Sequence, residues 1–205
     1  MKTNIVIVDD FLDDPYQMRM NALTANYPIP DSHHTYPGKN SDKSYLTDDM
    51  LEKIQNRWGD YLIPAVGSSC GFFRSSVEKD TFEQNIHIDP GWDVGGVLYL
   101  NTPNQCRPES GTHFYSHNIL NIERAPATPE EGKYLGFSDY EEIRNGIILG
   151  DGLDPSLWTR YASSPMKYNR LVLFDPLLWH SHGNNFGNCL ENSRLVMVFF
   201  FTKSK

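Results

Sequence analysis

Short runs of strand-forming residues, separated by turn residues, recur through most of the chain after residue 70, and this pattern restricts the possible folds more than any other feature. β-Branched and aromatic residues dominate the runs, and glycine, proline and asparagine punctuate them. Such strands pair antiparallel and do not build βαβ units. We therefore predict a mainly β protein, a sandwich or jelly roll with flanking helices. The predicted strands are residues 71–74, 82–88, 95–101, 112–116, 170–174 and 193–202.

The first seventy residues predict one strand and two helices. Residues 4–8 are a β-branched run typical of a strand. An aspartate before Pro15 begins a helix that extends to about residue 25, because proline suits the first helical position. Thr47 caps a second helix, whose apolar residues recur at helical spacing until Pro64 ends it.

The strand pattern stops between residues 118 and 169. A capping box at 138–141 opens a short helix, and an Asp-Pro pair at 154–155 opens another through residue 158. We expect this stretch of helices and loops to be inserted in a single domain that spans residues 1–205. The insertion is a candidate lid over a bound substrate, and the alternative is a structural elaboration with no role in binding.

Composition limits the partners of this chain. Its formal net charge of -8 at pH 7 disfavours a nucleic-acid partner, because lysine and arginine supply much of the affinity for phosphates. The apolar runs are too short for a signal peptide or a membrane span. Cys70, Cys106 and Cys189 are far apart and form no C-x-x-C pattern, which indicates reduced thiols and a cytoplasmic location.

The segment Asn85-Ile86-His87-Ile88-Asp89 carries the strongest functional signal. Alternate side chains of an extended segment point to opposite faces, so His87 and Asp89 share one face over two isoleucines. A third ligand from a distant strand would complete a facial triad of two histidines and one carboxylate, which suits Fe(II) with open coordination positions. A single His-x-Asp match has little specificity, so its surroundings have to support it.

The third ligand is expected at the end of a later strand, and RLVLFDPLLWHSH at 170–182 offers two histidines there. We favour His180 as the ligand. His182 shares its face if the segment stays extended, and would then be a partner of the ligands or contact a substrate. The alternative is that both histidines lie in a loop and bond to backbone carbonyls.

Arg194 opens a strand in which every following residue through Phe201 is apolar, so both faces of this strand are expected to be buried. A buried guanidinium is costly unless an anion accompanies it. The planar fork of arginine matches a carboxylate, which a bound organic acid would supply. The alternatives are an internal ion pair with an aspartate or glutamate, and a position at the exposed edge of the sheet.

Taken in order, these motifs resemble those of the 2-oxoglutarate and Fe(II)-dependent dioxygenases of the prolyl-hydroxylase-like group. The resemblance covers the N-terminal segment and most of residues 82–202, and its specificity lies in the ordered set. Residues 169–183 further resemble bacterial and phage proteins of this superfamily, which would mean expression in a bacterial host. The matching motifs are IVIVDDFL at 5–12, HID at 87–89, GGVLYLN at 95–101, SGTHF at 110–114, RLVLFDPLLWH at 170–180, and Arg194.

The resemblance implies a double-stranded β-helix, the cupin-like jelly roll, with a metal near one open end. It implies that His87, Asp89 and His180 bind iron. It also implies that Arg194, fourteen positions after the last ligand, binds the distal carboxylate of 2-oxoglutarate.

The sequence departs from the family pattern in two places. Ser110-Gly111 replaces a Gly-Gly pair, and His113 stands between the expected threonine and phenylalanine, which makes it a candidate for contact with the ligands or a substrate. Asn85, Tyr99 and Trp179 are further candidates for contact with cosubstrate or substrate, with packing as their alternative, and His182 is another.

A member of this family would use Fe(II), 2-oxoglutarate and molecular oxygen to hydroxylate a C–H bond. Its substrate would be an amino acid, a peptidyl side chain or a small metabolite. Asp89 favours hydroxylation over halogenation, because related halogenases lack this carboxylate so that chloride can bind the iron.

Two other classes of protein remain open. A zinc hydrolase is one, because His113 and His117 have the right spacing, but Phe114 stands where the catalytic glutamate of His-Glu-x-x-His would be. The other is a non-catalytic jelly-roll module that binds a ligand and keeps only a vestigial metal site.

Overall fold

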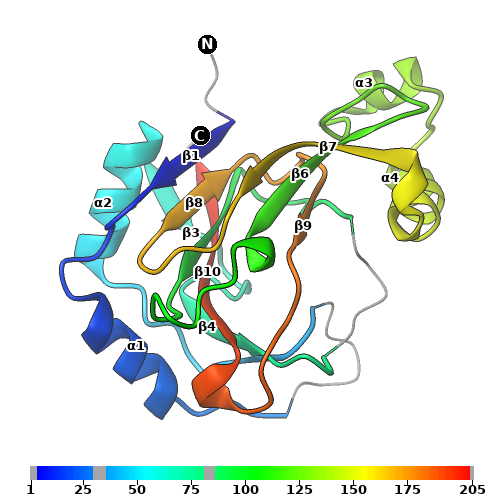
Figure 1. Ribbon diagram of the computed structural model, residues 1–205. Helices are drawn as coiled ribbons and strands as arrows, with labels where there is room; N and C mark the ends of the chain where they lie inside the picture. The colour runs from blue at the N-terminus through cyan, green and yellow to red at the C-terminus, as the bar shows by residue number, and fades with distance from the viewer. Residues whose placement is uncertain (1–3, 30–35, 81–85, 204–205) are drawn as a thin grey trace.

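Two antiparallel β-sheets form the centre of the computed structural model, which describes residues 4–29, 36–80 and 86–203. Its strands are β1 Ile5–Val8, β2 Lys39–Asn40, β3 Leu62–Pro64, β4 Phe72–Ser76, β5 Val94–Tyr99, β6 Thr112–His117, β7 Trp158–Ser164, β8 Leu171–Phe174, β9 His180–His182 and β10 Arg194–Lys203. The larger sheet has the order β1-β8-β5-β10-β4-β2, with β3 also paired to β10, and the smaller has the order β7-β6-β9 (Figure 1). The predicted mainly β architecture is confirmed.

β10 lies inside the larger sheet and sends its side chains to two different clusters. The odd-numbered residues from Leu195 to Phe201 join a core that includes residues of the N-terminal helices. Val196 and Val198 join a second cluster, which contains Phe114 of the smaller sheet. This alternation is expected of a strand that is buried on both faces. Arg194 belongs to the even-numbered set, so its side chain points into the space between the sheets.

Two helices, α1 (Pro15–Thr24) and α2 (Asp48–Trp58), cover one face of the larger sheet (Figure 1). Asp14 and Thr47 cap them, because each side chain accepts a hydrogen bond from a backbone N–H in the first turn. Both helix starts are therefore confirmed. Within the ranges that the structure describes, no helix is long and apolar enough to cross a membrane.

The second helix ends earlier than the sequence predicted. Gly59 adopts a left-handed φ of 86°, and its N–H bonds to the carbonyl of Gln55, which closes the helix. The apolar residues that follow form β3, which pairs with the end of β10 and buries Leu62. The apolar pattern up to Pro64 therefore belongs to a helix and a strand that pack into one core.

The predicted strand at 82–88 is not formed in its described part. Residues 86–88 make only an isolated bridge, in which His87 pairs with His180. Residues 81–85 lie outside the described residues, and Asn85 with them, so its role stays a prediction.

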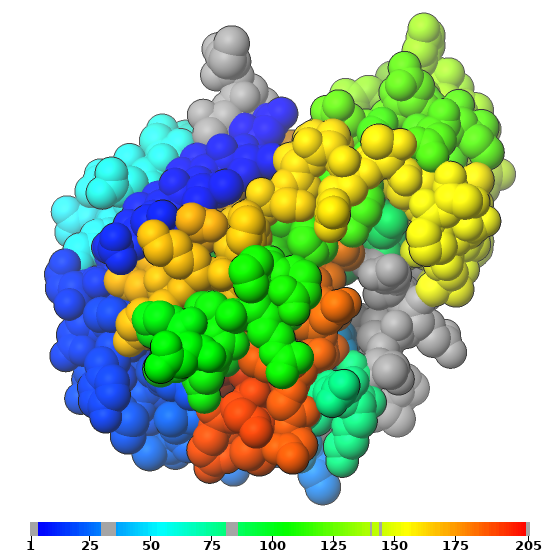
Figure 2. Space-filling model, in the orientation of Figure 1, coloured from blue at the N-terminus to red at the C-terminus, as the bar shows by residue number. Residues whose placement is uncertain are grey.

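Short helices and turns between β6 and β7 form a lobe at one end of the molecule, away from α1 and α2 (Figure 2). β7 corrects the prediction for this region, because the Asp-Pro pair opens only one 3-10 turn and Trp158 already pairs with His117 of β6. The insertion therefore covers 118–157 and not 118–169. Its elements are α3 Pro129–Tyr134, α4 Tyr140–Ile143, a π-helical turn Arg144–Ile148, and 3-10 turns Asp151–Leu153 and Pro155–Leu157; further 3-10 turns are Pro108–Ser110 and Leu190–Asn192.

An ion-pair cluster ties the end of β1 to the start of β8. Asp9 accepts hydrogen bonds from Arg170 Nε at 2.6 Å and from Lys167 Nζ at 2.8 Å. The hydrogen bond from Arg170, followed by that from Lys167, holds the pKa of Asp9 well below its usual range.

We expect Asp9→Asn to lower the free energy of unfolding at pH 7 by at most about 1 kcal/mol, because this partly exposed pair is screened by solvent. A carboxylate with a lowered pKa stabilises the fold fully above its unfolded pKa, about 3.9, and progressively less as the pH falls below it. Urea unfolding of both proteins should therefore show a difference at neutral pH that shrinks below about pH 4. A difference that did not change with pH would contradict this role of Asp9.

Candidate functional site

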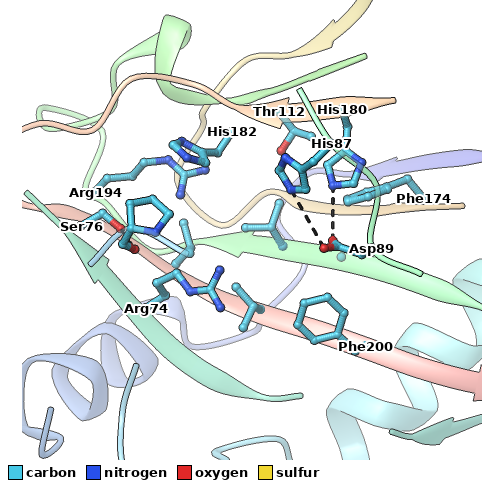
Figure 3. A pocket seen from close by; sticks show the side chains of 15 residues that line it. Arg74, Ser76, His87, Asp89, Thr112, Phe174, His180, His182, Arg194 and Phe200 are labelled. Carbon is cyan, nitrogen blue, oxygen red and sulfur yellow. Dashed lines mark hydrogen bonds and ion pairs between the residues drawn. The ribbon is translucent and has the colours of Figure 1, made fainter. Parts of the chain in front are cut away.

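A cavity of about 620 Å³, its open mouth included, lies between the two sheets. β10 and β4 supply one wall, and β9 with the segment at 86–89 supplies the facing wall. Three histidines, one aspartate and two arginines point into it (Figure 3). These six residues are His87, Asp89, His180, His182, Arg74 and Arg194.

His87, Asp89 and His180 form a cluster in this cavity, and one ligand atom from each lies within 4.8 Å of the others. His180 Nε2 is 3.3 Å from Asp89 Oδ2, and His87 Nε2 is 4.0 Å from Asp89 Oδ1 (Figure 3). These are the three residues that the family resemblance implied as metal ligands.

Backbone hydrogen bonds hold the cluster together. His87 and His180 exchange N–H to carbonyl bonds of 2.9 Å in both directions, and the N–H of Asp89 donates to the carbonyl of Pro176. Ile86 and Ile88 are buried in a different hydrophobic cluster, on the side opposite the ligand atoms. The alternation predicted for this segment is thus present although the segment is not a regular strand.

The orientation of His180 suits a metal ligand. Its Nδ1 donates to the carbonyl oxygen of Leu178 at 2.8 Å, which fixes the ring so that Nε2 faces the cluster. Burial opposes the ionisation of Asp89, but the hydrogen bond and charge of His180, with smaller contributions from His87 and Arg74, lower its pKa to about 2. Two imidazole nitrogens and one ionised carboxylate are a donor set that fits Fe(II).

His182 lies outside this cluster, beside Arg194 (Figure 3). Its Nδ1 donates to the carbonyl oxygen of Gly183 at 2.7 Å. Burial, followed by the charge of Arg194, lowers the pKa of His182 to about 3, so its ring is neutral at physiological pH. The structure therefore brings His180 into the cluster and leaves His182 as a neutral wall of the cavity.

Arg194 is only 5% exposed and lines the same cavity. Its Nε donates to the carbonyl oxygen of Ser110 at 3.0 Å, and Tyr99 lies 5.8 Å away, ring centroid to Cζ. Burial lowers the pKa of Arg194, yet a guanidinium keeps its charge at neutral pH. No described aspartate or glutamate forms an ion pair with it. Neither alternative from the sequence, an internal ion pair or an exposed edge, fits these contacts.

Tyr99 reaches the cavity through a neighbour. It is fully buried, and its hydroxyl lies 2.7 Å from the hydroxyl of Thr112, which lines the cavity. Thr112 was not among the predicted site residues, although it lies in the SGTHF motif. The available signal was its position next to His113 in a predicted strand. Neighbouring side chains of a strand point to opposite faces, so either Thr112 or His113 had to face the cavity.

His113 and Trp179 do not reach the cavity. His113 follows Thr112 on β6 and points to the other face, where its ring nitrogens bond to Ser163 and to the carbonyl of Glu109. Trp179 precedes His180, is fully buried, and packs on Trp158 with 5.2 Å between ring centroids. Alternation along a strand therefore turns both residues away from the position that was predicted for them.

Arg74 on β4 also lines the cavity, although it was not among the predicted site residues. It is the register partner of Val196 on the neighbouring strand β10. Paired residues point to the same side of a sheet, so Arg74 shares the cavity face with Val196 and Arg194. The one signal in the sequence was a charged residue in the otherwise apolar and small run GFFRSS.

Gly111 allows β6 to approach the chain after β7. A Cβ at this position would fall on the carbonyl oxygen of Ser164 and 2.8 Å from the backbone nitrogen of Met166. We expect Gly111→Ala to lower the free energy of unfolding by about 1–3 kcal/mol, because backbone atoms cannot move aside as a flexible side chain can. It should also displace the flanking Ser110 carbonyl and Thr112.

Gly132→Ala is the matched control, because its nearest atom is the carbonyl oxygen of Phe137 at 3.7 Å. Chemical unfolding of the native chain and both variants measures the effect. Equal stability of the Gly111 and Gly132 variants would show that β6 can shift without cost.

The chain is similar to solved structures with which it has little sequence in common. The non-heme alpha-ketoglutarate-dependent epimerase SnoN from nogalamycin biosynthesis matches with a TM-score of 0.54 and 12% identity, over 98% of this chain and 79% of that chain. EvdMO1 matches with a TM-score of 0.51 and 15% identity, over 98% of this chain and 48% of that chain. HygX from Streptomyces hygroscopicus, with nickel and 2-oxoglutarate bound, has a TM-score of 0.49 and 10% identity, over 99% and 84%.

The sheet order and the first two matches identify the fold as the double-stranded β-helix, which confirms the predicted fold class. The molecule is therefore a jelly-roll protein with a two-histidine, one-carboxylate cluster in its cavity. The chain belongs to DUF6445, a family of unknown function whose model matches residues 1–200. No curated protein sequence matches it.

Proposed function

We propose that this protein is an Fe(II)- and 2-oxoglutarate-dependent oxygenase that hydroxylates a C–H bond of an amino acid, a peptidyl side chain or a small metabolite. One observation carries the proposal. The cluster of His87, Asp89 and His180 shares a cavity with Arg194, a buried guanidinium without a carboxylate partner among the described residues.

Each residue has a defined task in this proposal. His87, Asp89 and His180 would hold the metal from one side and leave its other side open toward the cavity. Arg194 would pair with the distal carboxylate of 2-oxoglutarate through its two Nη groups, since its Nε is already bound to a carbonyl oxygen. Iron with 2-oxoglutarate, when bound, supplies the oxidising power for the reaction with molecular oxygen.

The hydroxyl of Thr112 and the neutral ring of His182 would complete the cosubstrate pocket. Tyr99 holds the Thr112 hydroxyl at 2.7 Å and thereby orients it. His182 can accept a hydrogen bond through Nε2 because its Nδ1 donates to a backbone carbonyl. As the third ligand, Asp89 would take the coordination position that a halide needs, which favours hydroxylation over halogenation.

The 118–157 insertion supports the ligand segment from behind. Ile86 donates to the carbonyl of Gly152, and Ile86 and Ile88 pack with Ile143 and Ile147 of the insertion. No described residue of 118–157 lines the cavity between the sheets. We therefore propose that it positions the ligands, rather than the lid role that the sequence suggested.

A cytoplasmic location is part of this proposal. Cys70, Cys106 and Cys189 are free thiols, which is typical of a reducing compartment, and the acidic net charge gives no reason to propose a nucleic-acid partner.

Anaerobic calorimetry with Fe(II) or Mn(II), followed by 2-oxoglutarate, tests the proposal. We expect 2-oxoglutarate to bind the metal-loaded chain and not the metal-free chain, and succinate to appear once oxygen and Fe(II) are supplied. A native chain that binds metal but not 2-oxoglutarate would be a jelly-roll binding module and not an oxygenase.

A further inference from the structure

A second cavity, of about 840 Å³ with its open mouth, adjoins the one between the sheets. The two share six lining residues, including His87 and Asp89 of the ligand cluster. We call the cavity between the sheets the inner cavity and the second one the outer cavity. Arg194 lines the inner cavity only, whereas Arg74 lines both. Arg74 is also the one arginine or lysine among the described residues that line the outer cavity, whose other wall includes Trp92.

Two contacts hold Arg74 in place, and a third fixes one of its partners. Its Nε donates to Asn40 Oδ1 at 2.8 Å, and its Cζ lies 4.0 Å from the ring centroid of Tyr36. Asn40 in turn donates from Nδ2 to the hydroxyl of Ser69 at 2.9 Å, which fixes the direction of its carbonyl oxygen. Figure 3 shows the guanidinium pointing into the cavity between the sheets, and Arg74 lines the second cavity as well.

Arg74 has no acidic ion-pair partner among the described residues. Tyr36 and, to a smaller extent, the carboxylate of Asp89 act on its charge, and the oxygens of Asp89 lie in the ligand cluster. Burial lowers the pKa of Arg74 to about 10, so the guanidinium is charged at neutral pH. An anion would offset the desolvation cost of this partly buried charge.

The charges of the loaded site lead to the same requirement. A divalent metal held by Asp89 would keep one positive charge, and Arg194 would add a second. The dianion 2-oxoglutarate would cancel both, and the charge of Arg74 would be left unmatched.

From these contacts we infer that the substrate is a small organic acid, whose carboxylate pairs with the Nη edge of Arg74 in the outer cavity. This inference rests on the proposed oxygenase function. Trp92 and Phe200, with ring centroids 6.2 Å apart, give the hydrocarbon part of such a molecule an aromatic wall next to the metal ligands. The cosubstrate would take the inner cavity because, of the two arginines, Arg194 lines that cavity alone.

Matched pairs of acids and amides test the inference. The probes are phenylacetate with phenylacetamide, hexanoate with hexanamide, and N-acetyl-L-valine with its amide. Each is added to the native chain loaded with Mn(II) and 2-oxoglutarate, and the paramagnetic broadening of its proton signals is measured. We expect at least one acid to bind about tenfold or more tightly than its amide, because a charged hydrogen bond contributes about 1.5–3 kcal/mol.

Three variants separate recognition by Arg74 from general effects. Arg74→Gln should remove the preference for the acid and keep 2-oxoglutarate binding, while Arg160→Gln, at an exposed position on β7, should change neither. Asn40→Asp should also remove the preference, because it gives Arg74 an internal carboxylate partner. Thermal unfolding of each variant verifies its fold.

The possible outcomes distinguish this inference from the function on which it rests. If the native chain binds 2-oxoglutarate but prefers no acid over its amide, or if Arg74→Gln keeps the preference, only the inference fails. If Arg74→Gln loses 2-oxoglutarate and Arg194→Gln retains it, Arg74 serves the cosubstrate and the inference fails as well. A native chain that does not bind 2-oxoglutarate contradicts the proposed function itself.

Discussion

Asp89→Asn is expected to lower the affinity for Fe(II) or Mn(II) by more than about a hundredfold and to abolish succinate formation, since even changes outside the ligand shell of a metal cost 10- to 100-fold. The substitution keeps the shape of the side chain but removes the carboxylate charge that the cluster supplies. Asp89 lies 3.3 Å from His180 Nε2, and its carboxyl is ionised at neutral pH. Two neutral imidazoles would then have to hold a divalent ion alone.

Asp93→Asn is the control for this variant, because Asp93 is an exposed aspartate four residues further along the chain. Calorimetric titration of the metal into both variants and the native chain gives the affinities. Thermal unfolding of the metal-free proteins shows whether the fold is kept. Tight metal binding by a folded Asp89→Asn variant would mean that the ion binds elsewhere.

Arg194→Gln is expected to weaken 2-oxoglutarate binding by about 30-fold or more, while metal binding stays close to native. Loss of one partner of a buried charge pair costs about 2–5 kcal/mol, and each 1.4 kcal/mol is about a factor of ten. Arg194 is 5% exposed, so little water could replace the lost guanidinium. Glutamine can still donate a hydrogen bond, but it cannot balance the charge of a carboxylate.

Arg57→Gln serves as the control for charge removal, since Arg57 is exposed at the end of α2. Titration of 2-oxoglutarate into each Mn(II)-loaded protein measures the effect. An unchanged affinity of the Arg194 variant would separate this arginine from the cosubstrate and leave its burial to be explained by packing.

Local patterns were sufficient to predict several elements of the fold and one feature of the site. The aspartate before Pro15 and Thr47 both cap helices, because a cap needs only a side-chain oxygen and the N–H groups of the next turn. The shared face of His87 and Asp89 required only an extended backbone. The apolar run after Arg194 predicted a strand buried on both faces, which the two clusters on either side of β10 confirm.

Other features depended on contacts between distant segments. The apolar spacing up to Pro64 continued past the true end of the helix, because helix and strand bury their side chains in the same core. The strand that begins at Trp158 was missed. The Asp-Pro pair before it indicated a helix, but it starts only one 3-10 turn, and the chain then pairs with β6. His113 and Trp179 turn away from the cavity, because their neighbours Thr112 and His180 face it instead.

The sequence by itself determined the alternation of side chains, the helix starts and the order of the ligand motifs, because each depends on a few adjacent residues. Only the tertiary structure decided which faces meet. The bridge between His87 and His180 closes the ligand cluster, and the pairing of Val196 with Arg74 brings a second guanidinium to the cavity beside Arg194. Both contacts depend on register between segments far apart in the chain, where a shift of one residue would turn each side chain to the other face.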